Sequence, residues 1–169
     1  MLPENEYHPY FKTYIDVLTN NGLSIIENLI KTGQELEELV SNLPKEKENY
    51  RYAAGKWTLK ELLVHIIDTE RIFIYRTLRF ARNDKTDLQG FDQDDYNDYA
   101  DANSRNLKDI LEEFISVRKS SITLFKSFSE EALLRMGTAS GNAISVRALG
   151  YLMSGHQQHH IKIFKERYL

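Results

Sequence analysis

Hydrophobic residues recur at helical spacing in four long stretches of the chain, and polar or proline-containing segments separate these stretches. The stretches cover residues 23–43, 58–82, 105–128 and 145–167. A shorter helical face before them ends near Asn21 and Gly22, residue types that often follow a helix. The pattern therefore predicts an all-α fold with one short leading helix and four long helices.

Residues at the predicted helix boundaries support this interpretation. Thr58 is followed three residues later by Glu61, the spacing of a capping box at a helix start. Ser129 suits the cap of a short helix, and Ser145 suits the cap of the last long helix. Pro44 ends the first long helix because proline has no N–H group to donate.

Two connections between these helices differ in length and composition. Residues 83–103 are acidic and rich in turn-forming residues, so an irregular crossover is expected there. A connection of this length suits two neighbouring helices of a bundle that run parallel. Residues 138–143, with the sequence TASGNA, predict a tight connection. The sequence therefore predicts a bundle in which one connection is long.

The composition is that of one ordinary globular domain, predicted to span residues 1–169. The chain contains no cysteine, which excludes a disulfide framework, a thiolate metal site and a cysteine nucleophile. Any metal ion bound by this chain must therefore use histidine, aspartate, glutamate or water as ligands.

The charge pattern argues against a nucleic-acid partner. The net charge is −3, and lysine and arginine are mixed with aspartate and glutamate along the chain. One predicted helix carries several charged residues that we expect to form ion pairs along its face: Asp68, Glu70, Arg71, Arg76, Arg79 and Arg82.

Neither a signal segment nor a run of eighteen apolar residues is visible. The sequence predicts a cytoplasmic protein with no membrane partner.

The last predicted helix carries histidines on its apolar face. Val146, Leu149, Met153, His156, His160 and Ile163 follow the alternating spacing of three and four residues that keeps them on one side of a helix. Two side chains four residues apart lie about 40° apart around the axis and one turn apart along it, so both imidazoles can reach one ion. His159 lies at the flank of this face, and we do not expect it to bind the ion.

The alternative for each histidine is an ordinary core residue whose ring nitrogens are hydrogen-bonded. Leucine, methionine and isoleucine surround His156 and His160, however, and a buried polar atom without a partner costs roughly 1–3 kcal/mol. A shared cation would remove that cost. His65 lies between Leu62 and Ile66 at the edge of the apolar face of the second long helix, so it also points inward. The three histidines are candidates for one metal site.

Several motifs resemble those of the DinB-like superfamily of metal-binding four-helix bundles. They are Lys56-Trp57-Thr58, Leu63 to Arg71 around His65, Gly90-Phe91-Asp92, Gly155-His156, His159-His160, and Glu166 to Leu169. The resemblance implies an up-down-down-up bundle and commonly a homodimer. It implies that His65, His156 and His160 hold one divalent metal ion. Relatives include S-transferases and isomerases that use bacillithiol or mycothiol, and others are described only as metal-dependent hydrolases.

Three interpretations of function are compatible with these observations. The first is an enzyme whose metal, zinc or nickel by preference, activates water or a low-molecular-weight thiol for attack on a small-molecule electrophile. Asp68 and Glu61 are candidates to move a proton or orient a ring, although surface ion pairs explain them equally well. The second is a bundle with a structural or regulatory metal, and the third is an interaction protein without metal. A pocket is expected near Tyr50, Tyr52 and Trp57.

Overall fold

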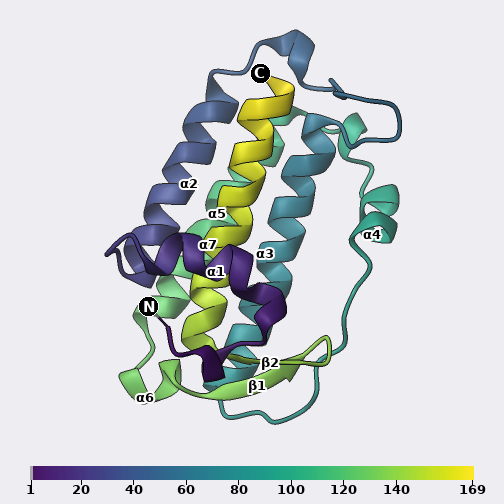
Figure 1. Ribbon diagram of the computed structural model, residues 1–169. Helices are drawn as coiled ribbons and strands as arrows, with labels where there is room; N and C mark the ends of the chain where they lie inside the picture. The colour runs from purple at the N-terminus through teal and green to yellow at the C-terminus, as the bar shows by residue number, and fades with distance from the viewer. Residues whose placement is uncertain (1) are drawn as a thin grey trace.

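Four long helices pack side by side in the computed structural model, which describes residues 2–169 (Figure 1). They are α2 (Ile25–Ser41), α3 (Leu59–Ala81), α5 (Leu107–Lys126) and α7 (Val146–Ile163), and a π-helical turn at Phe164–Tyr168 extends the last. Figure 1 shows α2 and α7 running in one direction and α3 and α5 in the other. The predicted all-α, up-down-down-up bundle is confirmed.

Side-chain caps fix where these helices begin. The Thr58 Oγ1 accepts a hydrogen bond from the Glu61 N–H at 3.1 Å, and a Glu61 carboxylate oxygen accepts from the Thr58 N–H at 2.6 Å. The Ser145 Oγ accepts from the Ala148 N–H at 3.0 Å at the start of α7. Each of these bonds satisfies a backbone amide at the start of a helix that would otherwise lack a partner. Both predicted caps are therefore present.

Two short helices complete the helical part of the chain. The leading helix α1 (Lys12–Thr19) lies across the face of α7 in Figure 1, and α6 (Glu130–Leu133) follows the Ser129 cap. A Cβ atom at Gly155 of α7 would lie only 2.0 Å from the Tyr14 carbonyl oxygen. The backbones of α1 and α7 thus approach so closely that only glycine fits at this crossing.

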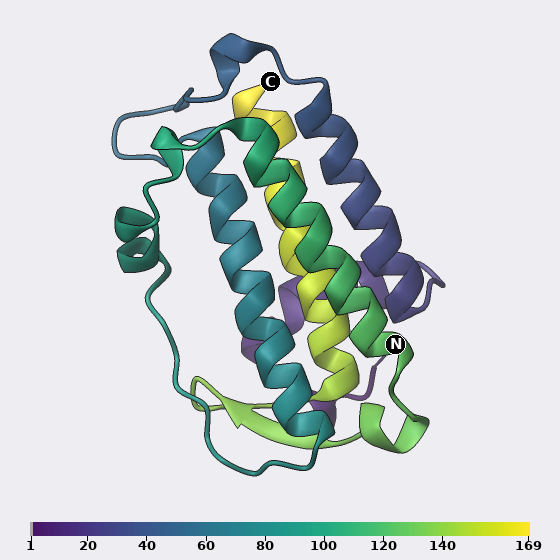
Figure 2. The same cartoon turned by 180° about the vertical axis from the view of Figure 1, so that it is seen from behind.

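The two connections contain more regular structure than the sequence predicted. The acidic crossover, which runs beside α3 in Figure 2, includes the helix α4 (Gln93–Tyr99). The Asp92 side chain begins this helix by accepting from two backbone amides. The predicted tight connection is a β-hairpin of β1 (Met136–Ala139) and β2 (Asn142–Ser145). Its turn residues Ser140 and Gly141 have φ of 53° and 74°, the left-handed geometry of a two-residue hairpin turn.

The hydrophobic core is divided into two clusters by a band of polar side chains. One cluster, with Leu29, Phe80 and Leu149, lies at the hairpin end, and the other, with Leu36 and Phe164, lies at the opposite end. The band between them contains Thr32, Glu70, Arg118, Gln157, His156 and His160. The polar band is therefore the part of the bundle interior that could hold a ligand or a metal ion.

No helix in the described part of the chain is both long enough and apolar enough to cross a bilayer.

Candidate metal centre

The bundle brings three histidine side chains from two helices to one place. His65 projects from α3, and His156 and His160 project from successive turns of α7. The Nε2 atom of His156 lies 3.2 Å from the Nε2 of His65 and 3.1 Å from the Nε2 of His160. One nitrogen from each ring lies within 4.8 Å of the other two, the arrangement expected of ligands that share an ion.

The spacing of these nitrogens agrees with metal ligation. Ligand nitrogens 2.0–2.1 Å from a tetrahedral zinc ion lie about 3.3 Å from one another. Hydrogen bonds among the rings explain the contacts less well, because a neutral imidazole has one N–H group and one acceptor nitrogen. The His156 Nε2 faces two other Nε2 atoms and can form only one such bond. The three-imidazole donor set therefore fits a divalent ion of the zinc or nickel type.

Burial keeps the three rings neutral at physiological pH. It lowers the pKa of His65 to about 4 and the pKa of His160 to about 3. Burial, followed by the charges of the neighbouring histidines, holds the pKa of His156 well below its ordinary value. Removal from water disfavours the charged imidazolium, so each ring retains the lone pair that a metal ion requires.

Aromatic rings surround the cluster. The Trp57 ring lies 4.8 Å from the His65 ring, centre to centre, and the rings of Phe73 and Tyr14 each lie 5.9 Å from that of His156. These contacts restrict the imidazole orientations and reduce access of water. Tyr50 and Tyr52, near which a pocket was also predicted, pack against Tyr168, with ring centres 6.3 and 5.3 Å apart.

Two cavities reach the histidines from different sides. A cavity of about 590 Å³ has His160, Trp57, Tyr52 and Glu61 in its wall, near the bundle end where a pocket was predicted. A second cavity of about 420 Å³, which was not predicted, has His156, Thr69, Phe73 and Arg76 in its wall. The cluster thus lies between two cavities that a small molecule could enter.

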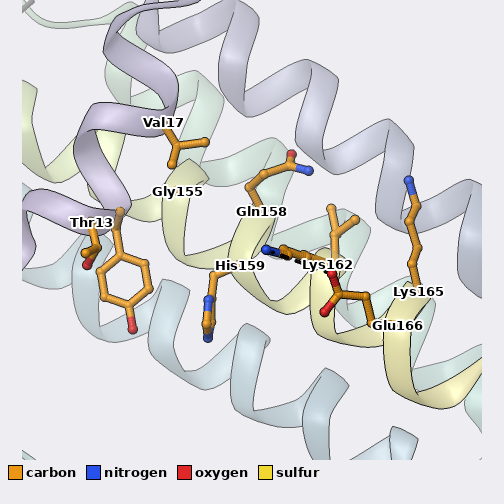
Figure 3. Close-up of a pocket in the computed structure, with 10 residues that line it drawn as sticks. Thr13, Val17, Gly155, Gln158, His159, Lys162, Lys165 and Glu166 are labelled. Atoms are coloured by element: carbon orange, nitrogen blue, oxygen red, sulfur yellow. Dashed lines mark ion pairs between the residues drawn. The ribbon is translucent and has the colours of Figure 1, made fainter.

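His159 lies outside the cluster, in a separate groove between α1 and α7. Figure 3 shows this groove of about 680 Å³, in which His159 projects from α7. The His159 side chain is exposed, and its ring lies 5.5 Å from the ring of Tyr14. Within residues 2–169, the group of histidines able to share an ion does not include it. This placement agrees with the prediction that His159 is not a ligand.

Comparison with known families and structures agrees with this geometry. The model of the DinB superfamily matches residues 28–164. The chain belongs to the DinB superfamily. It is also similar to the structure of YfiT from Bacillus subtilis, described as "a probable metal-dependent hydrolase with an unusual four-helix bundle topology". The TM-score is 0.77 at 16% sequence identity, over 95% of this chain and 91% of YfiT, so this likeness concerns the fold. No curated protein matched the sequence.

The two carboxylates suggested for proton transfer in this DinB-superfamily chain have other partners. Glu61 completes the helix cap and also accepts from the Asn103 Nδ2 at 2.6 Å. Asp68 lies 3.6 Å from Arg71, and burial raises the pKa of its carboxyl group. Among the described residues neither forms a hydrogen bond with a histidine. Glu61 does line the His160 cavity, and is therefore the nearer of the two to the candidate site.

The charged face predicted on α3 is only partly correct. Arg71 pairs with Asp68 and Glu113, and Arg79 pairs with Asp84. Glu70 instead points into the core, where it pairs with Arg118 of α5. Arg76 is buried and forms no ion pair with any of the residues described. The prediction missed this because helical spacing does not reveal which charges face another helix.

The sequence contains one indication that Arg118 points inward. Phe114, Arg118, Ser121 and Phe125 are spaced by four, three and four residues, so Arg118 lies on the same apolar face as the two phenylalanines. A buried arginine requires a partner of opposite charge, and Glu70 supplies it.

Proposed function

We propose that this DinB-superfamily protein is a metal-dependent enzyme in which His65, His156 and His160 hold one divalent ion. The ion, zinc or nickel by preference, supplies a Lewis acid that promotes deprotonation of water or of a small thiol near neutral pH. The attack is then directed at a small-molecule electrophile, as in hydrolysis or thiol transfer. The fit of the three neutral, converging imidazoles supports this proposal.

The observation that carries the catalytic interpretation is the access from cavities. His156 lies in the wall of one cavity, and His160 lies in the wall of another. A metal that only links two helices needs no such access, because structural sites have all their ligands from the protein. A catalytic centre must accept both a nucleophile and an electrophile. Access on two sides suits that requirement.

Other residues of the chain would position the reactants and exclude water. The rings of Trp57 and Phe73 flank the imidazoles and provide apolar surface for a substrate. Of the two carboxylates, Glu61 is the better candidate to accept a proton because it shares a cavity with His160. A thiol nucleophile would have to come from a cosubstrate, because the chain has no cysteine.

The proposal is tested by turnover with matched variants. The metal-loaded protein is screened against esters, amides, and thiols paired with electrophiles. His65→Ala removes a proposed ligand, and His159→Ala is the matched control on the exposed side of α7. We expect turnover that is lost in His65→Ala and retained in His159→Ala. Equal rates for the wild type and His65→Ala across the panel would reject the catalytic role.

A second candidate function is a structural or regulatory metal, and one observation favours it. The three histidines come from α3 and α7, so an ion would link two helices of the bundle. This alternative predicts that a chelator lowers the melting temperature while no substrate of the panel turns over.

The homodimer implied by the family resemblance stays a prediction, which light scattering would test.

A further inference from the structure

Arg76 is a buried cation without a counter-charge among the described residues. It projects from α3, and only 6% of its surface is exposed. Its Nη2 donates to the Gln89 carbonyl oxygen at 2.9 Å and to the Ser140 Oγ at 3.0 Å. Both acceptors are neutral. A buried charge is ordinarily paired, because its removal from water costs several kcal/mol. The position of Arg76 therefore calls for an anion.

The cavity that Arg76 lines is the one that reaches His156. Thr69 and Phe73 also line this cavity, and the Thr69 Oγ1 is buried with no partner among residues 2–169. His65, Thr69, Phe73 and Arg76 are spaced by four, four and three residues, so they lie on one face of α3. The face leads from the candidate metal ligands to the unpaired cation. The remaining wall contains four aromatic residues, Tyr10, Phe11, Tyr14 and Phe91, and three polar ones, Gln93, Ser140 and Asn142.

We propose that this cavity binds a small molecule with a carboxylate at one end and an apolar body, the carboxylate accepting hydrogen bonds from Arg76. The reacting end of the molecule lies beside His156. This inference names the substrate class of the proposed enzyme and rests on that function for its catalytic meaning. The binding itself follows from the cavity and the cation.

The arrangement favours a carboxylate over other ligands. A guanidinium has five N–H donors, of which Nη2 carries two, so the Nε and Nη1 donors have no partner among the described residues and either can donate to an incoming oxyanion. One cation in the wall matches one negative charge, whereas a phosphate dianion would leave a second charge uncompensated. The buried Thr69 hydroxyl and the aromatic surface then contact the rest of the molecule.

The helix geometry brings the cation close to the candidate ligand. The His156 ring lies 5.9 Å from the Phe73 ring, centre to centre. Phe73 precedes Arg76 by three residues, a rise of about 4.5 Å along α3. An acid with an aromatic or aliphatic body can therefore reach both Arg76 and His156 within this cavity of about 420 Å³.

A purely structural role for Arg76 accounts for part of the observation. Its Nη2 links the crossover at Gln89 to the hairpin turn at Ser140. Two neutral acceptors do not require a full positive charge, and an uncharged amide donor would serve them as well. The charge itself is left unexplained by this role. Substitution with glutamine therefore separates anchoring from anion binding.

The test measures binding to metal-free protein, so that no metal can attract the carboxylate. The probes are 4-phenylbutyrate and its neutral analogue 4-phenylbutanamide, compared by isothermal titration calorimetry near pH 7.5. We expect the wild type to bind the carboxylate at least tenfold more tightly than the amide. Arg76→Met and Arg76→Gln should bind the two probes equally. Arg79→Met, which removes a more exposed arginine that pairs with Asp84 and does not line the cavity, should keep the preference.

Two results would overturn the inference. One is an equal affinity of the wild type for the two probes, and the other is an undiminished carboxylate preference in Arg76→Gln. Binding of the amide by both Arg76 variants would verify that the cavity still folds, and Arg76→Gln covers the case in which Arg76→Met does not. If the wild type prefers the carboxylate but the metal-loaded protein shows no turnover, the anion-binding site is supported and the proposed catalytic function is rejected. If turnover requires His65 but the wild type shows no carboxylate preference, the catalytic function is supported and the anion-binding site is rejected.

Discussion

Two polar clusters lie on different sides of α7, and their hydrogen bonding differs. His156 and Gln157 are neighbours in sequence, but they point about 100° apart around the helix axis. On the Gln157 side, Arg118 donates to Glu70, to the Leu29 carbonyl oxygen at 2.8 Å and to the Thr32 Oγ1 at 3.0 Å. On the His156 side, the Nδ1 of His160 and the Thr69 Oγ1 have no partners among the described residues.

The difference between these clusters separates structure from candidate function. Arg118 and Glu70 form a buried ion pair 2.7 Å apart, and Gln157 and Ser121 satisfy the remaining atoms of the network. Such a network holds four helices in register and has no capacity for another ligand. The histidine side has incomplete hydrogen bonding and adjoins two cavities. A buried polar group without partners in the protein is a site where a ligand gains the most.

The largest effect is expected from breaking the satisfied network. Arg118→Met should lower the free energy of unfolding by about 3–5 kcal/mol, because it leaves the Glu70 carboxylate buried without a counter-charge. Denaturant unfolding of metal-free protein measures this change. Arg71→Met removes an exposed pair with Glu113 and should cost less than about 1 kcal/mol. Equal losses in the two variants would contradict the distinction between the clusters.

The next largest effect is expected on the histidine side. Alanine at His65, His156 or His160 should weaken metal binding by more than about 100-fold, because loss of outer hydrogen-bond partners alone costs 10–100-fold. Metal content of untagged protein, measured by mass spectrometry, checks this. His159→Ala should retain the wild-type metal content. Metal lost from His159→Ala and kept by His160→Ala would show that the wrong face of α7 was assigned.

Acid should destabilise the metal-free protein through the same histidines. The unfolded chain binds protons near the ordinary histidine pKa of 6.5, whereas the native pKa is about 4 for His65 and about 3 for His160. The unfolded state therefore binds more protons below pH 6.5. Each histidine then removes up to about 1.4 kcal/mol of stability per pH unit as the pH falls from 6.5 toward 4.

Urea unfolding between pH 7 and pH 5 in the presence of a chelator measures this slope. His65→Gln should reduce the slope by about one such contribution, because it removes one of the groups that titrate differently in the two states. An unchanged slope in His65→Gln would mean that the ring binds protons equally in the native and unfolded states, so that its native pKa is not lowered. That outcome would weaken the case for three neutral ligands.

The smallest effect is expected from a matched pair of threonines. Thr32→Val removes a hydroxyl that donates to the Asn28 carbonyl oxygen at 2.8 Å and accepts from Arg118, so it should cost about 1–3 kcal/mol. Thr69→Val removes a buried hydroxyl without a partner and should be neutral or slightly stabilising. Thermal unfolding of both variants measures the difference. A larger loss in Thr69→Val would contradict the view that the cavity side is unsatisfied.

Local sequence signals were sufficient for the four long helices and for the inward direction of the candidate ligands. Thr58, Glu61 and Ser145 predicted helix starts that the structure contains, since caps depend on residues within one turn. The spacing of His156 and His160 placed both on the apolar face of one helix. The hairpin and α4 were missed because their short segments carry little periodicity, and their stability depends on packing against α3.

The sequence by itself determined where the four long helices lie and which apolar side of each faces inward, because both depend on neighbours a few positions apart. Tertiary structure alone decided which inward side chains meet. It brought the His65 Nε2 within 3.2 Å of the His156 Nε2, paired Arg118 with Glu70 from another helix, and left Arg76 facing a cavity without an acidic partner among residues 2–169. These contacts depend on the rotation and register of helices far apart in the chain, which no local spacing specifies.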